Sequence, residues 1–600
     1  MLPFLINKNQ NGFVPGGNIF FSSHTLRDMI FYCKKENIDL ILLALDYTKA
    51  FDSVNFSFIH KTFDLFNFGE NFKTWIKIIF SGGKSCISNN GFISESFEIE
   101  RSTRQGDPIS PLIFILCLEI LFVKIRSDPN IQGISIVKNE IKLTAYADDA
   151  SYFMRNIESA ELLLGLIEKF SKVSGLEVNR SKSECLLLDF EGTLSEYDDN
   201  FMGIPVVENL KILGHFHGKN KIICDFQNFY SKLEKIDKVM NIWNQRHLTL
   251  IGKNLLINAL LNSLFIFNCQ IEIPPPDFIK LVDEKNKTFL WGGTAKIAHH
   301  SIIADYSEGG IKYKDLACLI TSVNVKFLFN RNNEDDKNSF VLFKINSTNE
   351  NYQTKYFNKS MNILDCKLKI PRKTLWQGHG FYYEVLKGFE KLLDSLPRSV
   401  EQLLSMPLWF NKFMDTSFDE TISKAGYNYI KDLFPLGKLL EINTIETFNL
   451  NLLEKHKLIT LVRNVPRQWS DYIHSQVAKE IVIYPFQSVN VNGQDMPLKN
   501  LDSKVIYNIL VRDKIRMPVG MINWCLDLEL SDLQIRTAFT FAHNCSSSTF
   551  DRMFQYKIAT QILPTNDYLT RYRVEDTNVC QQCNLEFEST AKLYKLYQHF

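Results

Sequence analysis

Long apolar runs are missing from this chain of 600 residues. The longest are Leu112–Leu118, which ends at Glu119, and 255–267, which Asn258 and Asn262 interrupt. A membrane-spanning helix needs roughly 18–20 consecutive apolar residues, so the sequence predicts none. The first residues, MLPFLINKNQNGF, also lack the basic start and apolar stretch of a secretory signal. We therefore expect an intracellular protein, nuclear or cytoplasmic, without a membrane partner.

Cysteines are too scattered for a disulfide framework. Only Cys580 and Cys583 lie close together among the 12 cysteines, which indicates a reducing compartment. The formal net charge of +1 excludes little, because acidic surface elsewhere can offset a basic groove. Residues 211–260 are locally basic, with eight Lys or Arg against three Asp or Glu, a net of +5.

Short strands alternate with helices in the first third of the chain. Residues 39–46, DLILLALD, are an apolar run bounded by acids and predict a buried strand, and residues 47–66 then take on helical spacing. Ser110 and Pro111 predict the N-cap and first turn of a helix that runs to about Arg126.

Further elements follow the same alternation. They are a hairpin over 85–100 around Asn89-Asn90-Gly91, two strands over 141–154 joined at Asp148-Asp149, a helix over 157–173 and a strand over 185–189. This pattern predicts a mixed α+β layer with acidic residues at strand ends. Residues 225–270 and the region beyond about 320 are predicted to be helical.

Three carboxylates carry the chemical hypothesis: Asp46 at the end of a predicted strand, and Asp148 and Asp149 at a hairpin tip. Nucleotidyl transfer uses two divalent cations about 3.5–4 Å apart. Hard cations such as Mg²⁺ take oxygen ligands, so carboxylates from separate strands suit such a site. Each feature alone has an ordinary interpretation, a solvated turn for the Asp pair and a helix cap or turn for Asp46.

A series of motifs favours the catalytic interpretation over these ordinary ones, because the motifs occur together and in order. They are QNGFVPGGNIFFSSHTLRDMI (10–30), LALDYTKAFDSV (43–54), RQGDPISPLIFILCLEIL (104–121), AYADDASYF (145–153), GLEVNRSKSE (175–184) and LKILGHFHG (210–218). Over about residues 10–320 the chain resembles the reverse transcriptases of LINE-type (non-LTR) retrotransposons. The resemblance implies an RNA-directed DNA polymerase that acts on an RNA template, a DNA primer or nicked target DNA, and dNTPs. No protein partner is evident.

The resemblance also implies metal ligands. Asp46, Asp148 and Asp149 would be the catalytic carboxylates, and the Tyr47 carbonyl would add a ligand. Two Mg²⁺ ions are expected, with Mn²⁺ as a substitute.

The nucleotide would lie against Phe51, Gln105, Gly106 and Lys182. A large ring at Phe51 leaves no room for a ribose 2′-hydroxyl, and glycine at 106 permits close backbone approach. Lys182 would neutralise or protonate the pyrophosphate. The alternative interpretation of Lys182 is a solvated lysine at a strand end, since Lys172 and Arg180 lie nearby.

The template and primer would contact other motif residues. Arg104 is expected to touch the template backbone, and Leu213 with Gly214 to hold the primer end. Tyr146 is expected to pack beneath the hairpin.

The implied fold is α+β, a right-hand polymerase palm with partial fingers, a helical thumb and a helix-rich C-terminal region. The predicted domains are a partial fingers block (1–38), a palm with finger elements (39–223), a thumb (224–275), a C-terminal helix-rich region (276–570) and a degenerate CxxC segment (571–600).

Two departures from the family pattern are visible. Family members carry finger motifs before the block at Gln10, and Gly17 replaces a usual arginine, so an N-terminally truncated enzyme is expected. At the C-terminus Cys580 and Cys583 match a zinc-binding segment, but Lys592 and Tyr597 stand where its other ligands would be, and zinc is not expected.

Two alternatives remain. The first is a catalytically inactive retrotransposon fragment with residual RNA binding. The second is an enzyme of the group II intron or telomerase kind.

Overall fold

The structure is a computed structural model. It describes residues 2–330 except 137, 138, 198 and 294; residues 380–392; residues 400–475 except 405, 407, 410–413, 415–418, 436 and 437; residues 488–565 except 492, 493, 498 and 499; and residues 569, 570 and 579. The chain forms two compact units. Unit 1 comprises residues 1–227, 331–382 and 397–486, and unit 2 comprises residues 228–330, 383–396 and 487–600.

A four-stranded antiparallel sheet is the centre of unit 1. Its order is β10 (Glu184–Leu188), β1 (Leu40–Leu45), β9 (Asp149–Met154) and β8 (Leu143–Tyr146). Strand β1 is apolar throughout because the sheet is covered on both faces.

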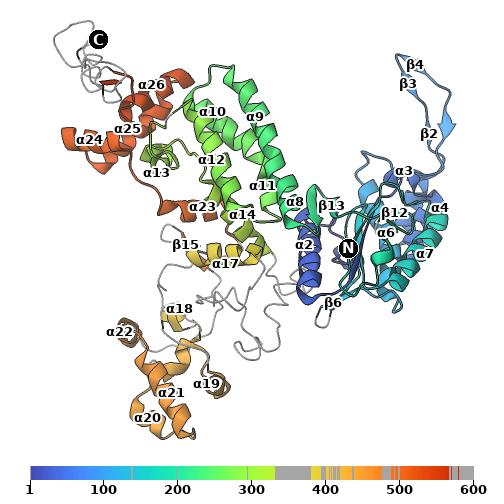
Figure 1. Ribbon diagram of the computed structural model, residues 1–600, viewed down its shortest axis with the longest axis horizontal. Helices are drawn as coiled ribbons and strands as arrows, with labels where there is room; N and C mark the ends of the chain where they lie inside the picture. The colour runs from blue at the N-terminus through green and yellow to red at the C-terminus, as the bar shows by residue number, and fades with distance from the viewer. Residues whose placement is uncertain are drawn as a thin grey trace. The chain divides into compact units, whose positions relative to one another are not determined.

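Helices cover the two faces of this sheet (Figure 1). On one face α2 (Ile19–Glu36) packs over Leu40 and Leu42 of β1. On the other, α4 (Phe56–Leu65), α6 (Ser110–Ser127) and α7 (Ile157–Ser174) share a core with alternate β1 residues. This part of unit 1 is thus a mixed helix and sheet structure, as predicted for the palm.

Three details differ from the sequence prediction. The helical segment after Asp46 is split into α3 (Ala50–Ser53) and α4, because Val54 between them is extended. Helix α6 has Ile109 rather than Ser110 as its N-cap, and no side chain caps it. The hairpin turn is centred on Ala147 and Asp148, since Asp149 already pairs with Tyr146 in the sheet.

Other chain segments cover both edges of the sheet. Gln10 forms a parallel bridge with Ala145 of β8, and the Asn11 N–H donates to the Ala145 carbonyl at 2.9 Å. At the opposite edge Val206 bridges Cys185 of β10 in parallel, and the Val207 N–H donates to the Cys185 carbonyl at 2.8 Å.

Short hairpins and helices complete the N-terminal part of unit 1. They are α1 (Leu2–Leu5), α5 (Glu70–Ile79), the projecting ribbon of β2 (Lys84–Ser85), β3 (Ser88–Asn89), β4 (Phe92–Ile93) and β5 (Phe97–Glu98), β6 (Ile134–Ile136), β7 (Asn139–Ile141), β11 (Asn200–Phe201), β12 (Ile204–Pro205), β13 (Asn209–Ile212), β14 (His215–Gly218) and α8 (Lys221–Asp225) (Figure 1). The ribbon turns at Asn90-Gly91, as the sequence predicts.

A separate apolar core organises residues 400–475. Its helices are α18 (Val400–Leu404), α19 (Glu420–Lys424), α20 (Ile442–Glu446), α21 (Leu452–Arg463) and α22 (Arg467–Ser475). Trp409 and Trp469 are buried in this core.

Unit 2 is predominantly helical. Its elements are α9 (Ser231–Asn244), α10 (Leu250–Leu256), α11 (Ser263–Cys269), α12 (Pro276–Trp291), α13 (His299–Ile302), α14 (Leu316–Asn330), the part of α17 (Gly380–Leu392) from residue 383, β15 (Ser488–Val491), β16 (Gln494–Pro497), α23 (Ser503–Arg512), α24 (Val519–Leu528), α25 (Asp532–Asn544) and α26 (Thr549–Ala559). Single π-helical turns lie at Phe226–Tyr230 and Ile257–Leu261.

Within the described ranges, no single helix is long and apolar enough to cross a membrane, although the bent pair Leu250–Leu261 and Ser263–Cys269 meets the same test of length and composition. The boundaries between the five predicted domains stay predictions.

Candidate active site

The sheet brings carboxylates from two distant parts of the sequence together. Leu45 is paired with Ala150, so the next residues outward, Asp46 and Asp149, stand opposite each other on adjacent strands. Side chains alternate along a strand, which places Asp46 on the same face as Leu40, Leu42 and Ala44. This face is apolar under α2 and becomes acidic where the strand ends.

A pocket of about 150 Å³ opens at these carboxylates. Its lining comes from β1, β9, β10 and β13 and includes Asp46, Asp149, Ser151, Lys182, Glu184, Lys211 and Leu213.

Hydrogen bonds fix the backbone at Asp46. The Asp46 N–H donates to Oγ of Ser183 at 3.1 Å, and the Asp46 carbonyl accepts from the Asn179 N–H at 2.8 Å. The Ser183 hydroxyl in turn donates to the Asn179 carbonyl at 2.8 Å. Residues 179–183 therefore hold Asp46 in place after β1 ends.

The electrostatics of the three carboxylates are unfavourable in isolation. Asp149 keeps part of its surface in solvent, but the protein around its carboxyl raises its pKa to about 6, and the charges of Asp148 and Asp46 add to this rise. Burial also raises the pKa of Asp148, with a further contribution from Asp46. A cation bound between these groups would relieve the repulsion.

The donor set suits a hard divalent cation better than zinc. Asp46, Asp148 and Asp149 offer only oxygen atoms, which Mg²⁺ prefers. The described residues contain no group of three or more His, Cys, Asp or Glu side chains arranged to hold a metal ion. We therefore expect any ion at the pair Asp46 and Asp149 to complete its coordination with water or substrate oxygens.

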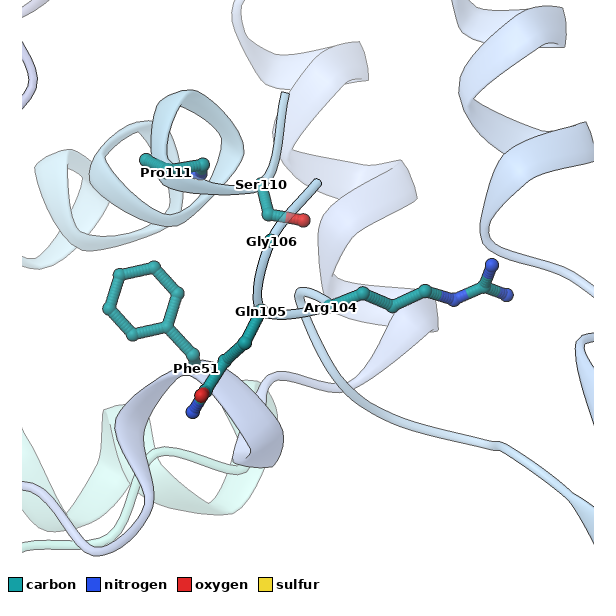
Figure 2. A pocket seen from close by; sticks show the side chains of 6 residues that line it. All are labelled: Phe51, Arg104, Gln105, Gly106, Ser110 and Pro111. Atoms are coloured by element: carbon teal, nitrogen blue, oxygen red, sulfur yellow. The ribbon is translucent and has the colours of Figure 1, made fainter. Parts of the chain in front are cut away.

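A second pocket, of about 340 Å³, contains the predicted sugar gate. It is lined by Phe51, Arg104, Gln105, Gly106, Ser110 and Pro111 (Figure 2). The Phe51 ring stacks on the buried ring of Phe114, with centroids 4.4 Å apart, and meets Phe13 edge to face at 6.3 Å. These two ring contacts hold the Phe51 side chain in place.

Gln105, Gly106 and Arg104 all line this pocket, but the Arg104 guanidinium points away from Phe51. Figure 2 shows the Gln105 side chain directed toward Phe51 and the Arg104 guanidinium pointing in the opposite direction. The guanidinium donates to the Ile79 carbonyl at 3.5 Å, and its buried Nε has no hydrogen-bond partner among the residues that the structure describes. The predicted template contact of Arg104 stays a prediction.

Other predicted residues are placed as follows. Leu213 and Gly214 form the two-residue turn between β13 and β14. Leu213 lines the carboxylate pocket, and its φ is positive, at 50°.

Tyr47 is not among the residues that line the carboxylate pocket. Its side chain is buried, and its hydroxyl hydrogen-bonds with that of Tyr152 at 3.1 Å. Tyr146 is half-buried at the end of β8.

Lys182 is exposed at the rim, beside two residues that the sequence prediction did not name as site residues. Glu184 pairs with Ala44 in the sheet, so its side chain joins the face of Asp46, and Lys211 enters from β13. Strand register determines the position of Glu184, whose only sequence signal was its two-residue distance from Lys182. Lys211 lies in a separate two-stranded sheet, β13 with β14, so tertiary packing brings it to the pocket. Cys580 and Cys583 lie outside the described residues.

Comparisons with known proteins agree on the N-terminal region. Residues 3–217 match the reverse transcriptase (RNA-dependent DNA polymerase) family. An uncharacterised 149 kDa protein of transposon TX1 from Xenopus laevis is 25% identical over 331 residues, which cover 54% of this chain and 25% of the relative. The Pol polyprotein of the type-2 retrotransposable element R2DM from Drosophila melanogaster is 25% identical over 243 residues, 38% of this chain and 22% of the relative.

The chain thus spans about a quarter of the length of these relatives. Among solved structures, telomerase from Candida albicans in complex with a fragment of telomeric RNA is similar at a TM-score of 0.29 and 11% identity, covering 57% of this chain and 53% of that one.

Proposed function

We propose that this chain is an RNA-directed DNA polymerase of the non-LTR retrotransposon kind, because residues 3–217 match the reverse transcriptase family and the chain is similar to retrotransposon proteins. It would add deoxynucleotides to a DNA primer, or to the end of nicked target DNA, on an RNA template. The observation that carries the proposal is the position of Asp46 opposite Asp149 where strand β1 ends, at a pocket that both carboxylates line. A second pocket, lined by Phe51, Gln105 and Gly106, adds to it.

Metal binding belongs to this proposal. Asp46 and Asp149 would hold Mg²⁺, with Asp148 as the third carboxylate. Two bound divalent cations would lower the pKa of the primer hydroxyl and stabilise charge on the departing pyrophosphate. The chain itself supplies the carboxylates and the backbone contacts that fix Asp46.

The second pocket would select the nucleotide. Phe51 would lie under the sugar, while Gln105 and Gly106 would border the base and sugar from the neighbouring loop. Lys182 and Lys211 line the same pocket as Asp46 and Asp149, where they would attract the triphosphate and offset its charge.

A primer-extension assay tests the proposal. We expect the 600-residue chain with Mg²⁺ to extend a DNA primer on an RNA template, and Asp46→Asn or Asp149→Asn to lower the rate by about 100-fold or more. Asp64→Asn is the matched control, because Asp64 lies on α4 and pairs with Lys73.

Two results would contradict the proposal. One is RNA binding by the folded chain without any extension, which would support the inactive-fragment alternative. The other is extension that survives both carboxylate substitutions.

A further inference from the structure

A buried glutamine lies against the turn that carries Asp148. Gln10 is 2% exposed, and its side chain contacts both backbone polar groups of Ala147. Its Nε2 donates to the Ala147 carbonyl at 3.0 Å, and its Oε1 accepts from the Ala147 N–H at 2.9 Å. The same Oε1 accepts from the Gly12 N–H at 2.8 Å.

Ala147 needs such support because its backbone is unusual. Its φ of 58° lies in the left-handed region, which residues with a Cβ rarely adopt. This conformation makes the two-residue turn between β8 and β9 and sets the direction of the next residue, Asp148. The primary amide of Gln10 satisfies the N–H and the carbonyl of Ala147 that the turn leaves without strand partners.

The chain around Gln10 is bound to the same hairpin. The Ala145 N–H donates to the Asn9 carbonyl at 2.8 Å, and the Ser22 hydroxyl donates to the Ala145 carbonyl at 3.1 Å. Gly12 packs so closely that a Cβ there would lie 2.2 Å from the Ala147 nitrogen. The backbone of residues 9–12 and the side chain of Gln10 together therefore form a clamp on the carboxylate turn.

We infer that Gln10 is a positioning residue for nucleotidyl transfer, which holds the Ala147-Asp148 turn so that Asp148 and Asp149 face Asp46 when the divalent cations bind. The inference rests on the proposed polymerase function. Gln10 contacts the turn backbone rather than substrate, so it acts through the carboxylates.

The test compares Gln10→Met with Asn11→Ala. Methionine keeps the length of glutamine but cannot bond Ala147, whereas the Asn11 side chain donates to Ser22 at 2.9 Å and does not touch the turn. Gln10→Glu is a milder variant that keeps an acceptor for the two N–H groups. The rate of hydrogen exchange at Ala147 and the following amides, measured in the metal-free chain, reports how stably the turn is held and does not depend on activity.

We expect Gln10→Met to speed exchange of the turn amides by about tenfold, Gln10→Glu less, and Asn11→Ala little. In primer extension, Gln10→Met should raise the Mg²⁺ concentration for half-maximal rate several-fold and lower kcat. The KM for dNTP should change far less, because the nucleotide pocket is intact. A purely structural role would lower stability in both variants and leave the metal requirement unchanged.

The outcomes separate the inference from the function on which it rests. If the wild-type chain does not extend a primer, the proposed function fails, while exchange still decides whether Gln10 holds the turn. If the wild-type chain extends and Gln10→Met matches Asn11→Ala in exchange and Mg²⁺ requirement, Gln10 is not a positioning residue.

Discussion

At the scale of the residue, the stack of Phe51 on Phe114 bears on sugar selection. A ring supported at 4.4 Å by a second, fully buried ring cannot retreat when a larger sugar enters. Sugar discrimination would therefore depend on two residues. Phe51 would contact the sugar, and Phe114 would hold the Phe51 ring in place.

Phe51→Val should raise incorporation of ribonucleotides relative to deoxyribonucleotides, because it removes ring atoms under the 2′ position. We expect a change of at least about tenfold in the ratio of kcat/KM values, which steady-state extension with matched rNTP and dNTP measures. Phe13→Leu serves as the control, since Phe13 meets Phe51 only edge to face and does not line the pocket. Unchanged discrimination in Phe51→Val would remove Phe51 from the site.

Residue identity was enough to nominate Asp46, Asp148, Asp149 and Phe51. It was not enough for Glu184, because only the register of β10 against β1 places its side chain on the face of Asp46. The bonds between Gln10 and Ala147 join residues 137 apart in sequence, so no local pattern indicated them.

At the scale of the element, the strands and long helices follow from their patterns. Strand β1 matches the prediction made from an apolar run bounded by acids. Helix α7 matches the helix predicted over 157–173, and the structure adds that Asn156 caps its N-terminus and that Gly175 ends it. The division between α3 and α4 was not predicted, since tertiary bonds impose it. The Asn55 N–H donates to the Ser174 carbonyl at 2.9 Å, and the Thr103 N–H donates to the Phe51 carbonyl at 2.6 Å.

Strand β14 carries a pH dependence. Burial lowers the pKa of His217 to about 3, and the nearby charge of Arg27 adds to this. The unfolded chain takes up this proton near pH 6.5, so the stability that neutral His217 contributes is complete above pH 6.5 and is lost as the pH falls toward 3. The ring centroid of His215 lies 4.9 Å from that of His217, and the pKa of His215 is also lowered, mainly by burial.

We expect His217→Leu to reduce the slope of unfolding free energy against pH by about 1.4 kcal/mol per pH unit between roughly pH 4 and 6. Urea unfolding, monitored by hydrogen exchange in β14, gives the free energy of unfolding at each pH and hence this slope. His247→Gln, which changes an exposed histidine, should leave it unaltered. Parallel slopes for wild type and His217→Leu would show that His217 does not titrate between the two states.

At the scale of the whole molecule, the local excess of basic residues bears on RNA binding more than the net charge does. Residues 211–260 carry eight basic side chains against three acids, whereas the complete chain has a formal charge of +1. Each cation that neutralises a phosphate releases counterions, so affinity should fall steeply with salt.

Lys235 and Arg246 are exposed in this region, and the Arg246 guanidinium lies 5.5 Å from the Trp243 ring centroid. Replacing both with alanine should lower the slope of log K against log salt by up to about two, which a fluorescence anisotropy titration at several salt concentrations measures. Lys438→Ala, which removes an exposed lysine among residues 400–475, should not change the slope. An equal slope in wild type and the double variant would place the RNA elsewhere.

The two segments that bridge β8 and β10 also affect how copies of this protein behave toward each other. An open edge strand is a template on which another chain can add a strand and begin to aggregate. Residues 9–12 bond β8 at Ala145 and residues 206–207 bond β10 at Cys185, so each edge of the four-stranded sheet is interrupted by another segment of the chain. Detachment of residues 9–12 would release the Asp148 turn and, in the same event, expose the edge strand β8 to pairing with another chain.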